Sequence, residues 1–234
     1  MKLFAIGDLH LSSGVNKPMD IFGPEWVGHA EKIAHNWREK VGPEDVVCVV
    51  GDISWAMQPH EAAPDLEWIG RLPGRKILIK GNHDYWWNKI SHISPWLPEG
   101  IHPLQGTSIT LDGVAVVGTR GWLIPGSPMF EEPQDRKVYN RECLRLENAF
   151  RSLGAIETKP IVALLHFPPM MKDGEPTRFT NILDTYGASV CLFGHLHGED
   201  RSSAFEGVRN GVGYHLVSCD HTNFSPVLID LKTN

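Results

Sequence analysis

Short runs of apolar, largely β-branched residues recur along the chain and predict buried β-strands. Runs of this length, bounded by glycine or polar residues, are typical of strands that are covered on both faces. Stretches with helical spacing separate the first three runs, and this alternation is typical of parallel sheets. The six predicted strands are residues 3–7 (LFAIG), 46–50 (VVCVV), 76–80 (KILIK), 114–118 (VAVVG), 161–165 (IVALL) and 190–193 (VCLF).

Two segments between the strands have the apolar spacing of amphipathic helices. The first ends at a glycine-proline pair at residues 42–43, which is a helix stop. The second runs from about residue 136 to residue 153. The predicted buried positions are Trp26, Ala30, Ile33, Trp37 and Val41 in the first helix, and Val138, Cys143, Leu146, Phe150 and Leu153 in the second.

The last thirty residues change character and favour strands. Two apolar stretches flank Asn210-Gly211, a pair suited to a tight hairpin turn, and a final strand is predicted over 226–231 (PVLIDL). The Pro- and Gly-rich segment 123–135 is interpreted as a surface loop near the functional site. No convincing boundary divides the chain, so we expect one domain over residues 1–234, with a mixed sheet or two packed sheets flanked by helices.

Composition and charge narrow the class of protein. Twenty-two basic and 28 acidic residues give a net charge of −6, which disfavours a nucleic-acid partner, although a local basic groove stays open. The four cysteines form no C-x-x-C pair. The first apolar run stops at Asp8, short of a secretion signal, and no run is long enough to span a membrane. We therefore expect a cytoplasmic protein without a membrane partner.

Side chains that ligate metals follow five of the predicted strands. Because the carboxyl ends of strands in α/β sheets meet at one crevice, these side chains are expected to converge. The D-x-H and H-x-H spacings strengthen this expectation, since positions i and i+2 of an extended chain lie on the same side. The candidate ligands are Asp8, His10, Asp52, Asn82, His166, His195 and His197.

Seven candidate ligands exceed the four of a tetrahedral zinc site and favour two divalent metals. Asp52, in the middle of the set, is the simplest bridge between them. Only two of the ligands are carboxylates, so two divalent ions leave a positive charge that attracts an anion. A phosphate ester with a bridging hydroxide suits such a site. Manganese, iron (Fe²⁺ or Fe³⁺) and zinc all fit a mixed His, Asp and Asn shell.

The motifs DLH, GD, GNHD, an isolated histidine and GHLH occur in this order over residues 8–197 and resemble the calcineurin-like metallophosphoesterases. The resemblance implies a four-layer α-β-β-α fold of two mixed sheets and a two-metal site. It implies that His83 helps the leaving group depart and that Asp84 orients it. The implied ligands are Asp8, His10 and His197 for one metal, Asn82, His166 and His195 for the other, and Asp52 for both.

One position departs from the family pattern. Trp55 stands three residues after Asp52, where the family usually has a charged residue. The tryptophan-rich segments resemble a branch of uncharacterised bacterial phosphohydrolases. For Trp55, Trp86 and Trp87, core packing is the favoured interpretation, with a wall that stacks on a base or sugar as the alternative. Arg120 and Arg178 are candidate phosphate contacts, against the alternative of surface residues.

The predicted function is hydrolysis of a phosphomonoester or phosphodiester by in-line attack of a hydroxide that bridges two divalent metals, with His83 assisting the leaving group. The substrate would be a phosphorylated small molecule or a nucleotide. One alternative is a non-catalytic metal-binding scaffold with the same fold, which would have no chemical need for His83. A second alternative, within enzymes, is a nuclease, which the net charge disfavours.

Overall fold

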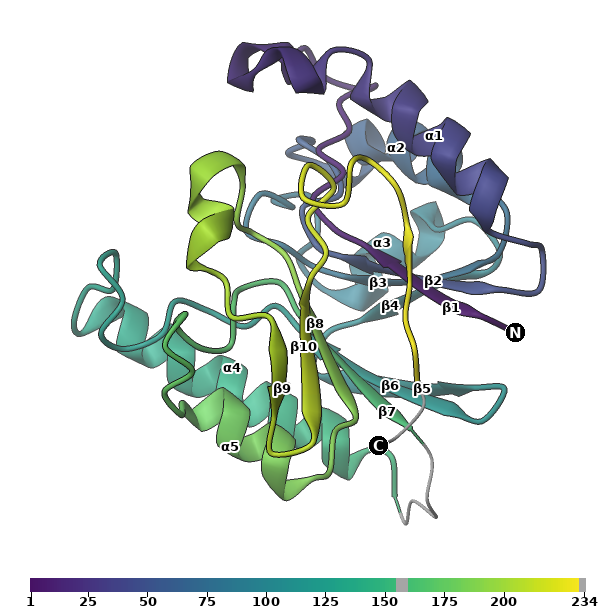
Figure 1. Cartoon of the computed structure of the whole chain (residues 1–234). Helices are drawn as coiled ribbons and strands as arrows, with labels where there is room; N and C mark the ends of the chain where they lie inside the picture. The colour runs from purple at the N-terminus through teal and green to yellow at the C-terminus, as the bar shows by residue number, and fades with distance from the viewer. Residues whose placement is uncertain (155–159, 232–234) are drawn as a thin grey trace.

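The predicted apolar runs form the centres of two β-sheets (Figure 1). The structure, a computed structural model, describes residues 1–154 and 160–231. Within each sheet the central strands are parallel and the edge strands β11, β5 and β9 pair antiparallel with their neighbours. The first sheet has the order β11 (Val227–Leu228), β1 (Leu3–Ile6), β2 (Val46–Val50), β3 (Arg75–Ile79) and β4 (Ile101–Leu104). The second has the order β5 (Thr107–Leu111), β6 (Val114–Thr119), β7 (Ile161–Leu165), β8 (Val190–Phe193), β10 (Val212–Leu216) and β9 (Gly207–Arg209).

Helices cover the outer face of each sheet, so the molecule has the four layers expected from the sequence (Figure 1). The first sheet is covered by α1 (His29–Lys40), α2 (Pro59–Gly70) and α3 (Ile90–Ile93), and the second by α4 (Gln134–Arg151) and α5 (Arg178–Thr185). Short 3-10 helices lie in the connections of the described chain: η1 (Asp20–Phe22), η2 (Pro24–Trp26), η3 (Ser94–Trp96) and η4 (Gly198–Ser203).

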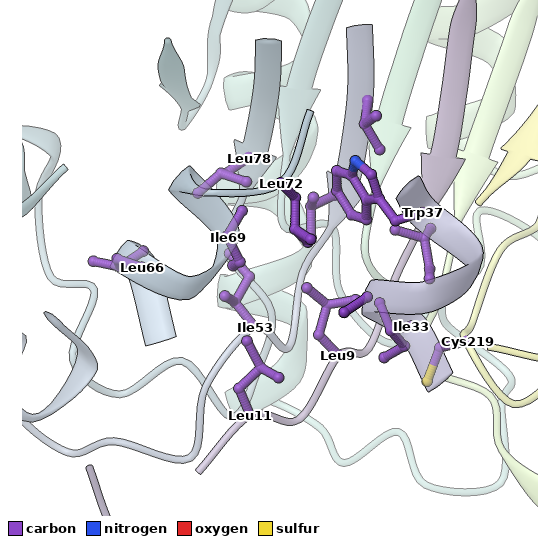
Figure 2. Close-up of a cluster of buried hydrophobic side chains, with 14 of the residues drawn as sticks. Leu9, Leu11, Ile33, Trp37, Ile53, Leu66, Ile69, Leu72, Leu78 and Cys219 are labelled. Carbon is purple, nitrogen blue, oxygen red and sulfur yellow. The ribbon is translucent and has the colours of Figure 1, made fainter. Parts of the chain in front are cut away.

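Three clusters of buried apolar side chains fill the three interfaces between these layers. In β1, Phe4 and Ile6 pack toward the helices, whereas Leu3 and Ala5 pack toward the second sheet, as the alternation of a strand requires. Figure 2 shows the cluster beneath α1 and α2, where Ile33 and Trp37 gather with side chains of the strands and loops. Both faces of the central strands are therefore buried, which explains their continuous apolar sequences.

The C-terminal hairpin forms as predicted, but the strand that follows it is shorter than predicted. Asn210 and Gly211 have φ values of 50° and 81°, and two successive positive φ values suit the tight turn between β9 and β10. The final strand is shorter than the predicted 226–231, because only Val227 and Leu228 pair with β1.

Helix α4 differs from its predicted buried face at two positions. Val138 and Leu153 are only half-buried, and Tyr139 is buried instead, while Cys143, Leu146 and Phe150 are buried as expected. Tyr139 packs edge-on against Phe179 of α5, so the contact with the neighbouring helix buries Tyr139 rather than Val138 at this turn. Within the described residues, no helix combines the length and the apolar character that crossing a membrane would require.

Candidate functional site

The seven candidate ligands lie at the carboxyl ends of β1, β2 and β3 in the first sheet and of β7 and β8 in the second. Face-to-face packing of the two sheets brings these five strand ends together. Two groups of side chains place their ligand atoms within 4.8 Å of one another and could hold a metal ion. These groups are Asp8, His10 and His197, and Asp8, Asp52 and His166.

Glycines allow the ligand-bearing loops to approach so closely. A Cβ atom on Gly81 would lie 2.0 Å from Oδ1 of Asp52, and a Cβ atom on Gly194 would lie 2.4 Å from Oδ2 of Asp8. Both distances are far below van der Waals contact, so a side chain at either position would displace a carboxylate. This explains why glycine directly precedes Asn82 and His195 in the sequence.

The ligands converge through a left-handed backbone rather than through an extended one. Asp8, His10, Asp52 and His195 have φ values of 59°, 46°, 48° and 72°. The interpretation of D-x-H as alternation along an extended strand is therefore wrong, although Asp8 and His10 do lie in one cluster. Non-glycine residues with positive φ are uncommon, cost free energy and concentrate at functional sites.

Two imidazoles and one carboxylate face one another in the first group. Nε2 of His10 lies 3.4 Å from Nε2 of His197, which lies 3.4 Å from Oδ1 of Asp8. Nδ1 of His197 donates to Oδ1 of Asp220 at 2.9 Å, which keeps a proton on Nδ1 and leaves Nε2 free to act as a ligand. Among the described residues, the buried Nδ1 of His10 has no hydrogen-bond partner.

Acceptor atoms also converge in the second group. Nδ1 of His166 donates to the carbonyl oxygen of Val50 at 3.1 Å, so Nε2 carries a lone pair. That lone pair faces Oδ1 of Asn82 at 2.7 Å and Oδ2 of Asp52 at 3.5 Å. Nδ1 of His195 lies 2.9 Å from the same Asn82 oxygen. Lone pairs that face one another are stabilised by a cation between them, so these residues fit a divalent metal.

The two carboxylates have opposite pKa shifts. Burial raises the pKa of Asp8, but its hydrogen bond to His197 and the charges of His197, His166 and His10 outweigh burial and bring the pKa below its usual value. Burial and the nearby carboxylates of Asp84 and Asp8 raise the pKa of Asp52 well above its usual value. The hydrogen bond from the His83 N–H and the charge of His197 offset this rise only in part, so a cation beside Asp52 would stabilise its carboxylate.

The pKa shifts of the histidines indicate which imidazoles are neutral. Burial lowers the pKa of His10 and His166, and it lowers the pKa of His195 to about 3. Burial alone would also lower the pKa of His197, but hydrogen bonds to Asp220 and Asp8 outweigh it and raise the pKa to about 10. A proton on His197 thus supplies charge that a bound metal would supply, and metal and proton compete for this site.

His83 lies at the rim of the site. Its backbone N–H donates to Oδ1 of Asp52 at 2.8 Å, and its Nε2 lies 4.0 Å from Oδ2 of the same carboxylate. Its side chain is 36% exposed, whereas the neighbouring Asp52 and His10 are buried. The ring of Trp55 lies 4.4 Å from the His83 ring and stacks on His10, with centroids 4.9 Å apart and planes at 21°. Trp55 therefore contacts both a candidate ligand and His83.

Asp84 ties the loops of the site together. Its buried carboxylate accepts hydrogen bonds from the backbone N–H groups of Gly81, Ile53 and Ser54 and from the indole of Trp86. No hydrogen bond joins this carboxylate to the His83 imidazole among the described residues. Asp84 thus holds the loops that carry Asp52 and Asn82. This role differs from the direct contact with His83 that the sequence led us to expect.

The remaining sequence candidates have different surroundings. Trp86 is 1% exposed and Trp87 is fully buried, so both pack in the core and offer no stacking wall. The Arg120 guanidinium lies over the ring of Trp122 at 4.3 Å. Arg178 forms an ion pair with Glu147 of α4 at 3.3 Å.

The sequence reasoning missed two residues that support the ligands. Asp220 holds Nδ1 of His197, and the ring of Phe167 lies 4.1 Å from the ring of His195. Asp220 follows β10 closely, at the end of the run HLVSCD, and this placement after a strand is the signal that could have identified it. Phe167 directly follows His166, but nothing in the sequence marks it as a contact of His195.

A comparison with known families matches residues 1–199 to the calcineurin-like phosphoesterases. The chain belongs to this family. The family resemblance of the motifs and the predicted fold are thereby confirmed. Membership and the two groups of ligating side chains support a metallophosphoesterase in general.

Proteins similar to this chain include two phage proteins and two solved structures. The Gene 66 proteins of Mycobacterium phages D29 and L5 are 42% and 38% identical over 78 and 79 residues, which is 33% of this chain and 37% of each relative. The chain thus matches well under half the length of these relatives.

A protein of unknown function from Aquifex aeolicus matches with a TM-score of 0.51 and 16% identity over 97% of this chain and 95% of its own. The protein TT1561 of Thermus thermophilus matches with a TM-score of 0.62 and 11% identity over 98% of both chains. These structures show the same fold.

Proposed function

We propose that this phosphoesterase holds two divalent metal ions and hydrolyses a phosphomonoester or phosphodiester. The observation that supports this proposal most directly is the position of Asp52 between two imidazoles. Oδ2 of Asp52 lies 3.9 Å from Nε2 of His10 and 3.5 Å from Nε2 of His166. A carboxylate oxygen so placed suits a ligand that is shared by two cations.

In this proposal, the ligands divide around Asp52 into two sets. Asp8, His10 and His197 hold one ion, Asn82, His166 and His195 hold the other, and Asp52 contacts both. When bound, the ions supply Lewis-acid chemistry that polarises the phosphoryl group and lowers the pKa of water. The mixed nitrogen and oxygen ligands suit manganese, iron or zinc.

His83 is the residue of this chain that we assign to the leaving group. It is half-buried, and burial together with the neighbouring His166 lowers its pKa. Its Nε2 is directed toward the Asp52 carboxylate and lies at the exposed edge of the site, where the oxygen of a departing alcohol can be reached. A proton or hydrogen bond from Nε2 to that oxygen would contribute about 10²–10⁴ in rate.

An apolar pocket beside His195 suits the organic part of the ester. It has a volume of about 390 Å³ and is lined by Trp122, Phe167, Met170 and Met171, with His195 at its border. The segment 123–129 provides another wall. Because aromatic and thioether side chains favour apolar ligands, we assign this pocket to an aromatic or aliphatic substituent of the substrate.

An assay on chromogenic phosphate esters tests the proposed function. The full chain with manganese should hydrolyse p-nitrophenyl phosphate or its bis ester, a chelator should abolish turnover, and added metal should restore it. His83→Ala should keep the metal and lose about 10²–10⁴ in kcat, whereas Asp52→Ala should lose both. His35→Ala, an exposed change on α1, is the matched control.

Two outcomes would contradict the proposal. Metal uptake without turnover on any ester would favour a non-catalytic scaffold. Full activity of His83→Ala would remove the leaving-group assignment while leaving the metal centre in place.

A further inference from the structure

Four cationic side chains surround a small pocket that is separate from the candidate metal ligands. Lys80 follows β3, Arg120 follows β6, and Arg141 and Arg145 come from α4. Gln105, after β4, and Asn88 complete the polar lining, and the Gln105 amide donates one hydrogen bond to the Asn88 carbonyl oxygen at 3.4 Å. The pocket has a volume of about 230 Å³, which is below the roughly 300–1,000 Å³ of pockets for drug-sized ligands and suits a small ion or group.

One carboxylate partly compensates these four cations. Glu142 is fully buried, and its Oε1 accepts from Arg145 at 2.7 Å and from Arg141 at 3.3 Å. Its Oε2 accepts from the hydroxyl of Thr119 at 2.6 Å. The hydrogen-bonding capacity of Glu142 is therefore largely used, and a single negative charge cannot balance four positive charges.

The other two cations lack a carboxylate partner within the described residues. The Lys80 ammonium donates to the backbone carbonyl of Trp87, which carries no net charge. The Arg120 guanidinium lies over Trp122 and makes no side-chain hydrogen bond to any described residue. Several cations held together at the edge of a protein repel one another, and a bound anion relieves this repulsion.

We propose that this pocket binds an oxyanion of the phosphate class at a site distinct from the metal centre. Guanidinium groups present planar pairs of N–H donors that match the oxygens of phosphate, and Lys80 adds a point charge. Gln105 contributes an amide donor without adding charge. Four cations and one carboxylate leave a net charge of +3 around the pocket, which favours an anion over a neutral ligand.

The pocket adjoins the metal centre through the backbone. Lys80 stands two residues before Asn82, and the carbonyl oxygen of Arg120 accepts from the N–H groups of His166 and Phe167 at 2.9 and 3.1 Å. The bound anion can therefore come from two sources, both of which carry phosphate oxygens. It is either a second phosphoryl group of a substrate bound at the metal centre or a free phosphate ion.

Calorimetric titration of inorganic phosphate into the full chain, freed of divalent metal on a chelating resin, tests the site without catalysis. Gln105→Glu places a negative charge in the pocket and leaves the Glu142 ion pairs intact, so it should weaken phosphate binding about tenfold. Arg151→Gln, an exposed change at the far end of α4, is the control and should bind phosphate as the wild type does. Circular dichroism verifies that both variants fold.

Wild-type protein that fails to bind phosphate at millimolar concentration would overturn the proposal. Equal affinity of Gln105→Glu and wild type would also overturn it. Because binding is measured without turnover, this result is independent of the proposed phosphoesterase activity.

The source of the anion is identified by a second measurement, which does rest on that activity. KM is compared for a nucleoside monophosphate and the corresponding diphosphate in the presence of manganese. If Gln105→Glu raises KM about tenfold for the diphosphate alone, the pocket holds a second phosphoryl group of the substrate. If phosphate binding falls and both KM values are unchanged, the pocket holds free phosphate.

Discussion

His197 donates its Nδ1 proton to the Asp220 carboxylate, which lies 2.9 Å away and also accepts from the backbone N–H of Gly198. This contact fixes the ring of His197 so that Nε2 points at Asp8 and His10. Asp220 is therefore a positioning residue for the candidate metal site, although it is not itself a ligand.

Replacement of Asp220 by asparagine should weaken metal binding about 10–100-fold, because the ring of His197 loses the negative charge that orients it and makes Nε2 a stronger ligand. Calorimetric titration with manganese measures the change. Asp20→Asn, an exposed change in η1, serves as the control. An unchanged manganese affinity in Asp220→Asn would show that His197 needs no such support.

Gly194→Ala should abolish uptake of metal at the site that contains Asp8. The added Cβ atom would lie 2.4 Å from Oδ2 of Asp8 and would force that carboxylate out of position. Gly213→Ala is a matched control, since its nearest contact is the end of the exposed His215 side chain at 3.3 Å. Metal content by elemental analysis distinguishes the variants, and a metal-replete Gly194→Ala protein would contradict the steric argument.

Trp55→Ala should lower kcat about 10–100-fold, because the rings of both His10 and His83 lose a packed neighbour. Trp55→Phe retains an aromatic face and should lose much less. The assay is steady-state turnover of a chromogenic phosphate ester with manganese. Equal turnover of Trp55→Ala and wild type would show that this tryptophan only fills space.

Lys76 should make stability depend on pH in the alkaline range. Its ammonium donates to the carbonyls of Gly70 and Leu72 at the end of α2, and burial lowers its pKa to about 8 from the usual 10.5. Between these two values the unfolded chain binds more protons than the folded chain, so this residue makes the free energy of unfolding rise as pH rises from about 8 to about 10.5.

Urea unfolding of wild type and Lys76→Met at pH 7.5 and pH 10.5 measures this contribution. The free energy of unfolding of wild type minus that of Lys76→Met should increase from pH 7.5 to pH 10.5. The same difference for the exposed change Lys40→Met should stay constant. A relative stability that falls with pH would contradict the sign of the shift.

Met171→Ser should raise KM about fivefold for an aromatic phosphate ester and leave KM for a methyl ester unchanged. The substitution removes part of the apolar wall of the pocket beside His195, and burial of apolar surface contributes roughly 25 cal/mol per Å². Met57→Ser changes an exposed methionine that does not line this pocket and is the control. Equal KM ratios in both variants would exclude this pocket as the binding site of the ester substituent.

The strands and the layer arrangement were largely predictable from the sequence. The runs at 46–50 and 161–165 become β2 and β7 with the predicted bounds, because a strand buried on both faces must be apolar throughout. Strands β4 and β5 were missed, since IHPL carries a proline and has half-buried residues in its middle, and TSITL has no buried residue. Helix α2 lies in the helical stretch predicted between the second and third runs, but its bounds were not predicted, because Pro64 interrupts its sequence.

The candidate ligands could be identified one by one from the sequence, but the residues that hold them in place could not. Asp220 and Asn82 are both polar residues that follow strands, yet Asp220 has no motif partner in the sequence. The basic pocket joins Lys80, Arg120 and Arg145 from three elements, and no local pattern links residues so far apart.

By itself the sequence determined the periodicity of the strands, the glycines that precede candidate ligands and the choice of the candidate ligands themselves, because each of these depends on neighbours within a few residues. Tertiary structure alone decided the left-handed backbone at Asp8 and Asp52, the pairing of His197 with Asp220 and the burial of Trp86. These features depend on contacts between distant strands and loops, and such contacts exist only once the two sheets have packed together.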